Sequence, residues 1–205
     1  MNAISLAIGT LTMAGVLTAF LLPRDHISSS QQPAEETPRT AAPERMIVRL
    51  TPEFPDMSVE QLVRGASRVV VGTIESSDHT APDAGYPYDQ YQVQVAETFT
   101  GAGPNSLAVR VYGGASASYD LVMQGAPKFA AGERVLLFLT TAPSLEYAGV
   151  FGLNQGVYRL SADVNADYGS ATSLHNGVSM PAVDLIGSVL DAEAKIQASS
   201  TPTPR

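Results

Sequence analysis

The apolar residues of this chain fall into short runs with the spacing of β-strands, and these runs occupy the middle of the sequence. Residues 68–76 (RVVVGTIES) are dense in β-branched side chains, which favour strands. In residues 91–100 (YQVQVAETFT), apolar and polar positions alternate, as expected for a strand with one buried and one exposed face. Residues 134–140 (RVLLFLT) are almost continuously apolar, which is typical of a strand buried on both faces. The pattern predicts a mainly β fold.

Turn residues connect these strands and complete a predicted barrel. The sequence GAGPNS predicts a tight turn into a strand at residues 107–112, and residues 156–161 predict a last strand. Gly72, inside the first strand, suits a bulge at the corner of a small barrel. The segment 46–54 alternates weakly and predicts an edge strand that Pro52 interrupts. Together these elements predict an OB-like five-stranded Greek-key barrel.

Two helices are predicted, one on either side of the strands in the sequence. Ser58 precedes Gln61 by three residues, and this spacing predicts a capping box at the start of a short helix through about Ala66. Residues 181–198 predict an amphipathic helix packed on the barrel. Its apolar positions at helical spacing are Ala182, Leu185, Val189, Ala192 and Ile196. The end of the chain, residues 199–205, predicts a frayed tail.

The first 45 residues divide into an uncharged run and a polar segment. Residues 3–22 carry no charged side chain, and twenty helical residues extend about 30 Å, the thickness of the bilayer core. Residues 1–26 therefore predict a transmembrane anchor or a cleaved signal segment. The anchor is favoured because no basic side chain precedes the run and no Ala-x-Ala site follows it closely. Residues 27–45 predict a disordered linker, and residues 46–198 the barrel domain with its C-terminal helix.

Charge and cysteine content exclude several classes of function. The formal net charge is −8, and residues 58–160 contain nine acidic and six basic side chains. Nucleic-acid binding relies on clustered Lys and Arg, so nucleic acid is not an expected partner. The chain has no cysteine, which excludes disulfides, thiol catalysis and thiolate metal sites. Packing alone must hold the domain together.

The sequence carries no recognisable catalytic motif. His26, His79 and His175 are scattered along the chain and are expected to be solvated. No Gly-x-Ser-x-Gly turn is present to expose a serine nucleophile. Catalysis would require the fold to gather His79, Ser118 and Asp120. We therefore expect a protein that is not an enzyme and that has no cofactor.

One acidic segment is a weak candidate for a calcium site. Asp163, Asn165 and Asp167 have the spacing of three oxygen ligands in a calcium loop. Glycine, however, falls at the seventh position of that loop instead of the sixth, and Leu174 occupies the position of the bidentate Glu. A turn rich in Asp, Asn and Gly is the favoured interpretation.

Tyrosines near the predicted loops are the candidate binding residues. They are Tyr86, Tyr88, Tyr112, Tyr119 and Tyr147. An aromatic ring with a polar tip suits a saccharide or peptide surface beside a barrel. Ordinary packing inside the barrel is the alternative explanation for most of them. The irregular, glycine-rich segment 113–132 is the predicted rim at which a partner is met.

Four stretches of the sequence carry a family resemblance. They are SVEQLVRGASRVVVGTIES, YQVQVAETFTGAGPNSLAVRVYGG, FAAGERVLLFLTT and FGLNQGVYRL. In order and spacing they resemble an uncharacterised family of exported bacterial OB-like β-barrel domains, with Val135 where the family often has Tyr. More remotely, they are similar to the netrin-like modules of tissue inhibitors of metalloproteinases. Those inhibitors hold the protease zinc through an N-terminal cysteine, and this chain has none.

The resemblance and the residues together lead to a functional expectation. The resemblance implies that the domain lies outside the cytoplasm. We expect a non-catalytic, membrane-tethered extracytoplasmic module that binds or assembles with a protein, peptide or glycan partner and is anchored through residues 3–22. The alternative is a netrin-like regulator that is secreted after cleavage and inhibits extracellular hydrolases.

Overall fold

The computed structural model describes residues 45–82, 85–141, 146–161 and 169–200. The predicted membrane segment, the linker up to residue 44 and the predicted calcium ligands Asp163, Asn165 and Asp167 lie outside these residues. Within the described ranges, no helix has both the length and the apolar composition needed to cross a membrane.

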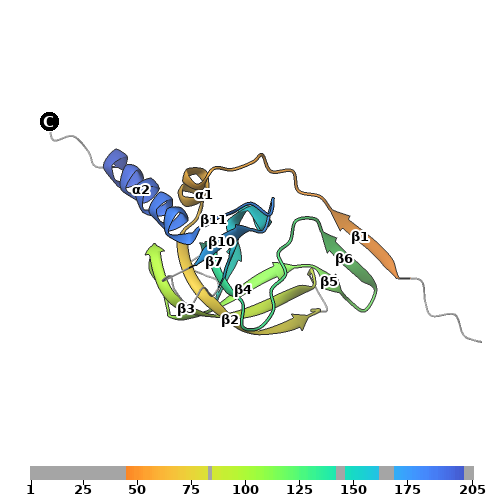
Figure 1. Cartoon of the computed structure of the whole chain (residues 1–205). Helices are drawn as coiled ribbons and strands as arrows, with labels where there is room; N and C mark the ends of the chain where they lie inside the picture. Colours follow the sequence, from red (N-terminus) through yellow and green to blue (C-terminus); the bar gives the residue numbers. More distant parts are fainter. Residues whose placement is uncertain (1–44, 83–84, 142–145, 162–168, 201–205) are drawn as a thin grey trace, which may run out of the picture. The chain divides into compact units, whose positions relative to one another are not determined.

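The fold is mainly β with a C-terminal helix, as the sequence predicts (Figure 1). One sheet contains eight strands in the order β11-β10-β9-β7-β2-β3-β4-β8. The bounds of its strands are β2 (Arg68–Thr80), β3 (Tyr88–Thr100), β4 (Ser106–Tyr112), β7 (Arg134–Thr141), β8 (Tyr147–Val150), β9 (Val157–Leu160), β10 (Ser170–Ser173) and β11 (Ser179–Pro181). This sheet is not the simple five-stranded barrel of the prediction, because three strands extend it and β8 was not expected.

The strand pairings nevertheless connect five of these strands in a cycle. Strand β8 pairs in parallel with β4 and also antiparallel with β7. Each of the strands β2, β3, β4, β8 and β7 therefore pairs side by side with the next, and β7 pairs with β2 to close the cycle. We refer to these five strands as the ring. The predicted last strand, β9, lies outside the ring and pairs with the first half of β7 and with β10. Strands β8 and β9 therefore pair with different parts of the same edge of β7. The sequence predicted that residues 156–161 form the last strand of the barrel, but β8 closes the ring instead.

Strands β2 and β3 form a longer hairpin than the sequence indicates. Cross-strand pairing continues to Thr80 and Tyr88, beyond the ends of the predicted strands 68–76 and 91–100. Proline and glycine do occupy the connection itself. The register shifts at Gly72, which confirms the predicted bulge.

A second, three-stranded sheet contains the predicted edge strand. It has the order β1-β6-β5, with β1 (Met46–Leu50), β5 (Gly114–Ala115) and β6 (Tyr119–Met123). Strand β1 runs parallel to β6 and lies beside it in Figure 1. The predicted irregular segment 113–132 thus supplies two short strands, and β1 does not join the ring.

Helix α1 (Val59–Gly65) begins at the predicted capping box. The Gln61 amide donates to the Ser58 Oγ at 3.3 Å, and the Ser58 amide donates to the Gln61 Oε1 at 2.8 Å. These two bonds satisfy backbone donors that the first turn leaves free. A short 3-10 helix, η1 (Leu153–Gly156), separates β8 from β9.

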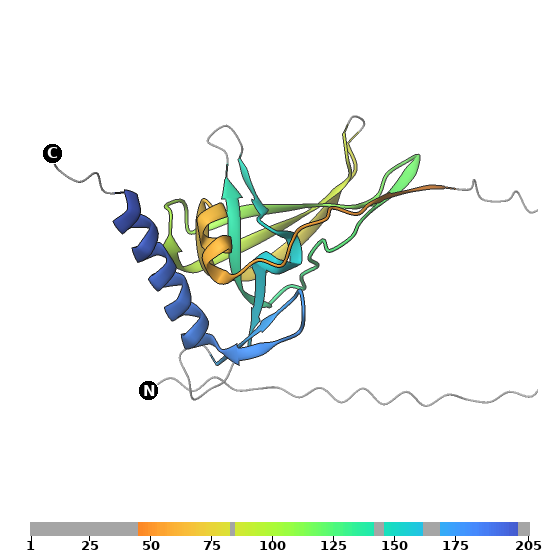
Figure 2. The ribbon, with the colours of Figure 1, turned by 90° about the horizontal axis from the view of Figure 1, so that it is seen from above.

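Helix α2 (Ala182–Ser200) presents the predicted apolar face to the sheet. Ala182, Leu185, Val189 and Ala192 are buried. Helices α1 and α2 contact each other and lie on the same side of β2 and β7 (Figure 2). The helix ends at Ser200, two residues beyond the predicted end at residue 198, and residues 201–205 of the predicted frayed tail lie outside the described ranges.

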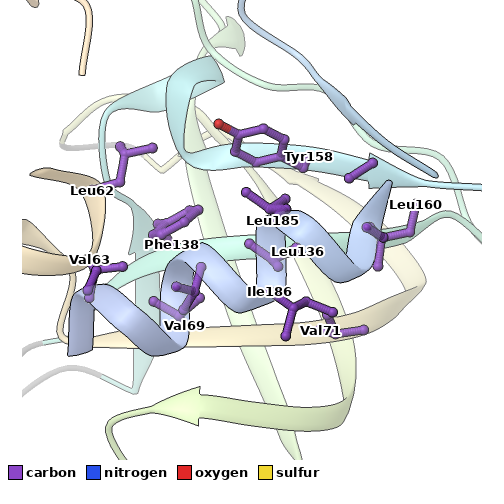
Figure 3. Packing of buried hydrophobic residues seen from close by; sticks show 14 residues of the cluster. Leu62, Val63, Val69, Val71, Leu136, Phe138, Tyr158, Leu160, Leu185 and Ile186 are labelled. Carbon is purple, nitrogen blue, oxygen red and sulfur yellow. The ribbon is translucent and has the colours of Figure 1, made fainter. Parts of the chain in front are cut away.

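Two apolar clusters lie on opposite faces of β2 and β7. The outer cluster joins these strands to the helices, and in Figure 3 Leu185 and Ile186 of α2 lie against Leu136 and Phe138. The inner cluster is contributed by all five strands of the ring together with Phe129 and Val157. Since β2 and β7 are covered on both faces, their almost continuous apolar sequences are explained.

Candidate binding site: tyrosines around Arg110 on strands β3, β4 and β8

The alternation of β3 and β4 places polar and aromatic side chains on the outer face of the ring. On β4, Val109 and Val111 belong to the inner cluster, so the residues between and after them lie on the opposite face. The register pairs Tyr88 with Tyr112 and Gln90 with Arg110. Tyrosine, glutamine and arginine side chains from two neighbouring strands are therefore brought together outside the barrel core.

Arg110 is at the centre of this group. Its guanidinium carbon lies 3.9 Å from the centroid of the Tyr147 ring and 4.5 Å from that of the Tyr88 ring. Its Nε donates a hydrogen bond of 2.8 Å to the Gln90 Oε1. Two cation–π contacts and one hydrogen bond fix the orientation of a long side chain that would otherwise be mobile in water.

Tyr112 joins the remaining rings to Arg110. Its ring packs edge-on against Tyr86 and Tyr88, with centroid separations of 6.5 Å and 6.3 Å. A hydrogen bond with Tyr147, followed by partial burial, raises the pKa of Tyr112 above its ordinary value. We call Tyr86, Tyr88, Arg110, Tyr112 and Tyr147 the aromatic surface.

The aromatic surface is accessible to a partner. Tyr86 is 55% exposed and Tyr112 is 39% exposed, and both are among the exposed large hydrophobic side chains of the described residues. Tyr and Arg are enriched where protein surfaces bind partners tightly. The rings are also braced by each other, so little side-chain entropy is lost when a ligand binds.

Four of the five predicted tyrosines belong to this surface. The fifth, Tyr119, lies on β6, and its hydroxyl donates a hydrogen bond of 3.0 Å to the carbonyl of Gly85, the neighbour of Tyr86. Arg110 was missed at the sequence level. Its signal was the alternation of residues 107–112, which places it on the same face as Tyr112.

The three residues that catalysis would need do not form a catalytic group. The Nδ1 of His79 lies 2.7 Å from Oδ1 of Asp89, and its Nε2 lies 2.8 Å from the carbonyl of Ala115. Asp120 contacts Arg45 at 3.4 Å, while the Ser118 amide donates to Ser116. No contact among the described residues joins Ser118 to His79.

Both described histidines are exposed to solvent, as predicted, and each also has a partner that the sequence did not indicate. His79 bonds to Asp89 and to a backbone carbonyl, and the Nε2 of His175 lies 3.0 Å from Oδ1 of Asp56. Tertiary contacts bring these partners together across the fold, and nothing in the spacing of the sequence indicated them. His26 lies outside the described residues.

We expect protonation of His79 to stabilise the fold. Both of its neighbours are acceptors, so only the doubly protonated ring donates to each of them; the Ala115 carbonyl, followed by the Asp89 carboxylate, raises the pKa of His79. The stabilisation is fully present below the unfolded pKa of about 6.5 and is lost as pH rises through the higher folded pKa.

Urea unfolding at pH 5.5 and pH 8.5 measures this dependence. The wild type should lose more stability between these two conditions than His79→Gln does, and NMR should report a folded-state pKa for His79 above its ordinary value. His175→Gln is the matched control because it removes the other described histidine. An identical pH dependence of the wild type and His79→Gln would contradict the assignment.

No metal centre is visible in the parts of the chain that the structure describes. Within them, no three side chains among His, Asp and Glu come close enough together to hold an ion. Asp163, Asn165 and Asp167 lie outside these parts, so the calcium hypothesis stays a prediction.

Comparison with known proteins does not assign the chain to a family. No protein-family model and no curated protein matches it. The resemblance to exported OB-like domains therefore stays a prediction, and the functional argument rests on the geometry of the aromatic surface.

Proposed function

We propose that this protein is a non-catalytic binding module whose aromatic surface holds a peptide or glycan segment of its partner. The observation that carries the proposal is the arrangement of four tyrosines around Arg110 on an exposed face. Tyr rings supply large contact areas with few rotatable bonds, and their hydroxyls supply hydrogen bonds. Arg110 adds a planar group that donates to carbonyl or carboxylate oxygens.

The arrangement of strands supports the same proposal. We propose that the ring is an OB-like Greek-key barrel in which β2, β3, β4, β7 and β8 are the five barrel strands. In OB-folds the face of the second and third strands binds extended polymers, and here those strands are β3 and β4. The net charge of −8 disfavours nucleic acid as that polymer, which leaves a peptide or a glycan.

The proposal places the module outside the cytoplasm on a membrane tether. It rests on the uncharged run at residues 3–22 and on the resemblance to exported domains. Intact mass measurement of the protein purified from membranes tests the tether. A mass that includes residues 1–26 is expected, and a mass that lacks them would exclude the tether and favour secretion.

Substitutions within the aromatic surface should weaken binding. The full chain is applied to glycan and peptide arrays, and the best ligand is then titrated against Arg110→Ala and Tyr112→Ala. Each substitution should raise the Kd about tenfold or more, because each removes a contact at the centre of the surface.

Phe54→Ala is the matched control, since Phe54 is 49% exposed but lies outside the aromatic surface. It should leave the Kd unchanged. Circular dichroism of each variant verifies that the fold is retained. Failure of the full chain to bind either array, or unchanged binding by the two surface variants, would contradict the proposed function.

A further inference from the structure

A cavity of about 360 Å³ lies next to the aromatic surface. Its walls come from the start of β2, the turn between β3 and β4, and strands β4, β7 and β8, and they include Arg68, Gly103, Leu139 and Tyr147. This volume lies in the range of small-molecule sites in proteins. Tyr147 belongs both to the cavity lining and to the aromatic surface, so the two adjoin at this residue.

Arg68 is a buried cation in the wall of this cavity. Arg68 is only 3% exposed. Its Nη1 donates to the carbonyl of Pro104 at 3.0 Å and its Nη2 donates to Oγ1 of Thr98 at 2.8 Å. Its Nε has no hydrogen-bond partner, and burial lowers the pKa of Arg68. An arginine nevertheless stays charged in a protein.

The charge of Arg68 is not neutralised by the described part of the chain. Both of its acceptors are neutral, and none of the ion pairs there includes Arg68. A buried charge without a counter-charge is costly, and such groups are found preferentially at functional sites. A ligand anion would supply the missing charge.

The β3–β4 turn is built closely around this guanidinium. A Cβ atom at Gly103 would lie 2.5 Å from Nη1 of Arg68, so any larger residue would displace the arginine. The hydrogen bonds to Pro104 and Thr98 position the guanidinium, and the absence of a side chain at Gly103 leaves room for it. A cation held in this way is prepared for an anion before the ligand arrives.

The remaining walls favour a ligand with an apolar body. Leu107, Leu139 and Ala148 line the cavity, and the last two are almost completely buried. Glu146 also lines the cavity, but its side chain is exposed to solvent. A phosphate or sulfate would gain nothing from the apolar walls, whereas a carboxylate joined to an aliphatic group matches both parts of the cavity.

We propose that the cavity binds a carboxylate attached to an apolar group, with the carboxylate next to Arg68 and the apolar group against Leu107 and Leu139. Two sources offer this chemistry. One is the C-terminal end of a peptide, whose preceding residues would continue past Tyr147 onto the aromatic surface. The other is a free small carboxylic acid. The peptide source rests on the proposed function, and the small acid does not.

N-acetyl-leucine and N-acetyl-leucinamide test the cavity directly, since they differ only in the carboxylate. Each is titrated into the full chain while NMR follows the backbone amides of residues 102–108 and 146–150. N-acetyl-leucine should shift these signals saturably, and the amide should bind at least about tenfold more weakly. Equal effects of the two probes, or no effect of either, would overturn the proposal.

Variants that leave Arg68 in place test the cavity without removing this buried side chain, and circular dichroism verifies that each of them is folded. Glu146→Gln removes a negative charge from the cavity and should tighten N-acetyl-leucine binding about two- to fivefold. Glu75→Gln, on an exposed position of β2 that does not line the cavity, should have no effect. Ala108→Leu fills the cavity and should abolish binding. Unchanged binding in both Glu146→Gln and Ala108→Leu would place the ligand elsewhere.

A longer probe distinguishes the two sources. A heptapeptide that ends in leucine with a free carboxylate is compared with N-acetyl-leucine and with its own amidated form. If the peptide is the source, it binds more tightly than N-acetyl-leucine, and Tyr112→Ala weakens only the peptide. If it binds no more tightly, the cavity proposal stands with a small acid, and the peptide form of the proposed function fails.

Discussion

Replacing Leu185 with alanine should lower the free energy of unfolding by about 2–5 kcal/mol. Leu185 is fully buried in the outer cluster, where α2 packs on β7 (Figure 3). The substitution removes apolar area from the interface and leaves a cavity that the rigid sheet fills only in part. Because α2 is held to the sheet mainly by this apolar face, its docking should weaken together with the global fold.

Leu190 on the same helix provides the matched control. It is 48% exposed, so Leu190→Ala should change the free energy of unfolding by less than about 0.5 kcal/mol. Urea unfolding followed by circular dichroism measures both variants under the same conditions. Equal losses of stability in the two variants would mean that α2 does not pack on the sheet as described.

Gly72→Ala should also destabilise the protein, by about 1–3 kcal/mol. A Cβ atom at this position would lie 2.7 Å from the carbonyl oxygen of Gln94 and 2.8 Å from Cγ1 of Val93. Backbone cannot move aside as a flexible side chain can, so β2 and β3 would have to separate at the bulge. The bulge lies within the ring, and the strain would be felt by both strands.

Gly187 offers a control in which the same substitution acts in the opposite direction. It lies within α2, and a Cβ atom there would meet no other atom within 4 Å. Gly187→Ala should therefore stabilise the protein by up to about 1 kcal/mol, because alanine favours the helix and restricts the unfolded chain. Thermal unfolding measures both. A stable Gly72→Ala variant would show that the bulge tolerates a side chain.

The elements that could be predicted from the sequence are those with a local signature. The β-branched run of β2 and the continuous apolar run of β7 predicted strands that the structure contains. The spacing of Ser58 and Gln61 predicted a capping box, and the apolar positions of α2 predicted its buried face. Each of these signals depends on neighbouring residues, so it can be recognised without knowing the fold.

The elements that were missed have no such signature. Strand β8 has only four residues, two of them Ala148 and Gly149, and β10 is composed of serine, threonine and alanine. These segments become strands because the free edges of β4, β7 and β9 are available to pair with them. Strand β8 closes the ring because it pairs with the edges of both β4 and β7. The sequence pattern had instead indicated residues 156–161, now β9, as the last strand of the barrel.

The candidate site divides in the same way. The type and approximate position of its residues were visible in the sequence, because tyrosines near strand ends suit a binding surface. The role of Arg110 depends on a register between strands distant in sequence, which places its guanidinium against Tyr88 and Tyr147. The burial of Arg68 is equally unexpected, since an arginine at the start of an apolar strand would normally extend into water.

The sequence by itself determined the elements with a clear apolar period or cap, which are β2, β3, β7, α1 and α2, together with their apolar faces and the absence of a thiol in the chain. It could do so because periodicity and capping act over a few residues. Only the tertiary structure decided which strand closes the ring, which charged side chains are buried and which tyrosines meet. These outcomes follow from pairing and packing between segments far apart in the chain. The free energy of folding there depends on tertiary contacts, which the local sequence pattern does not indicate.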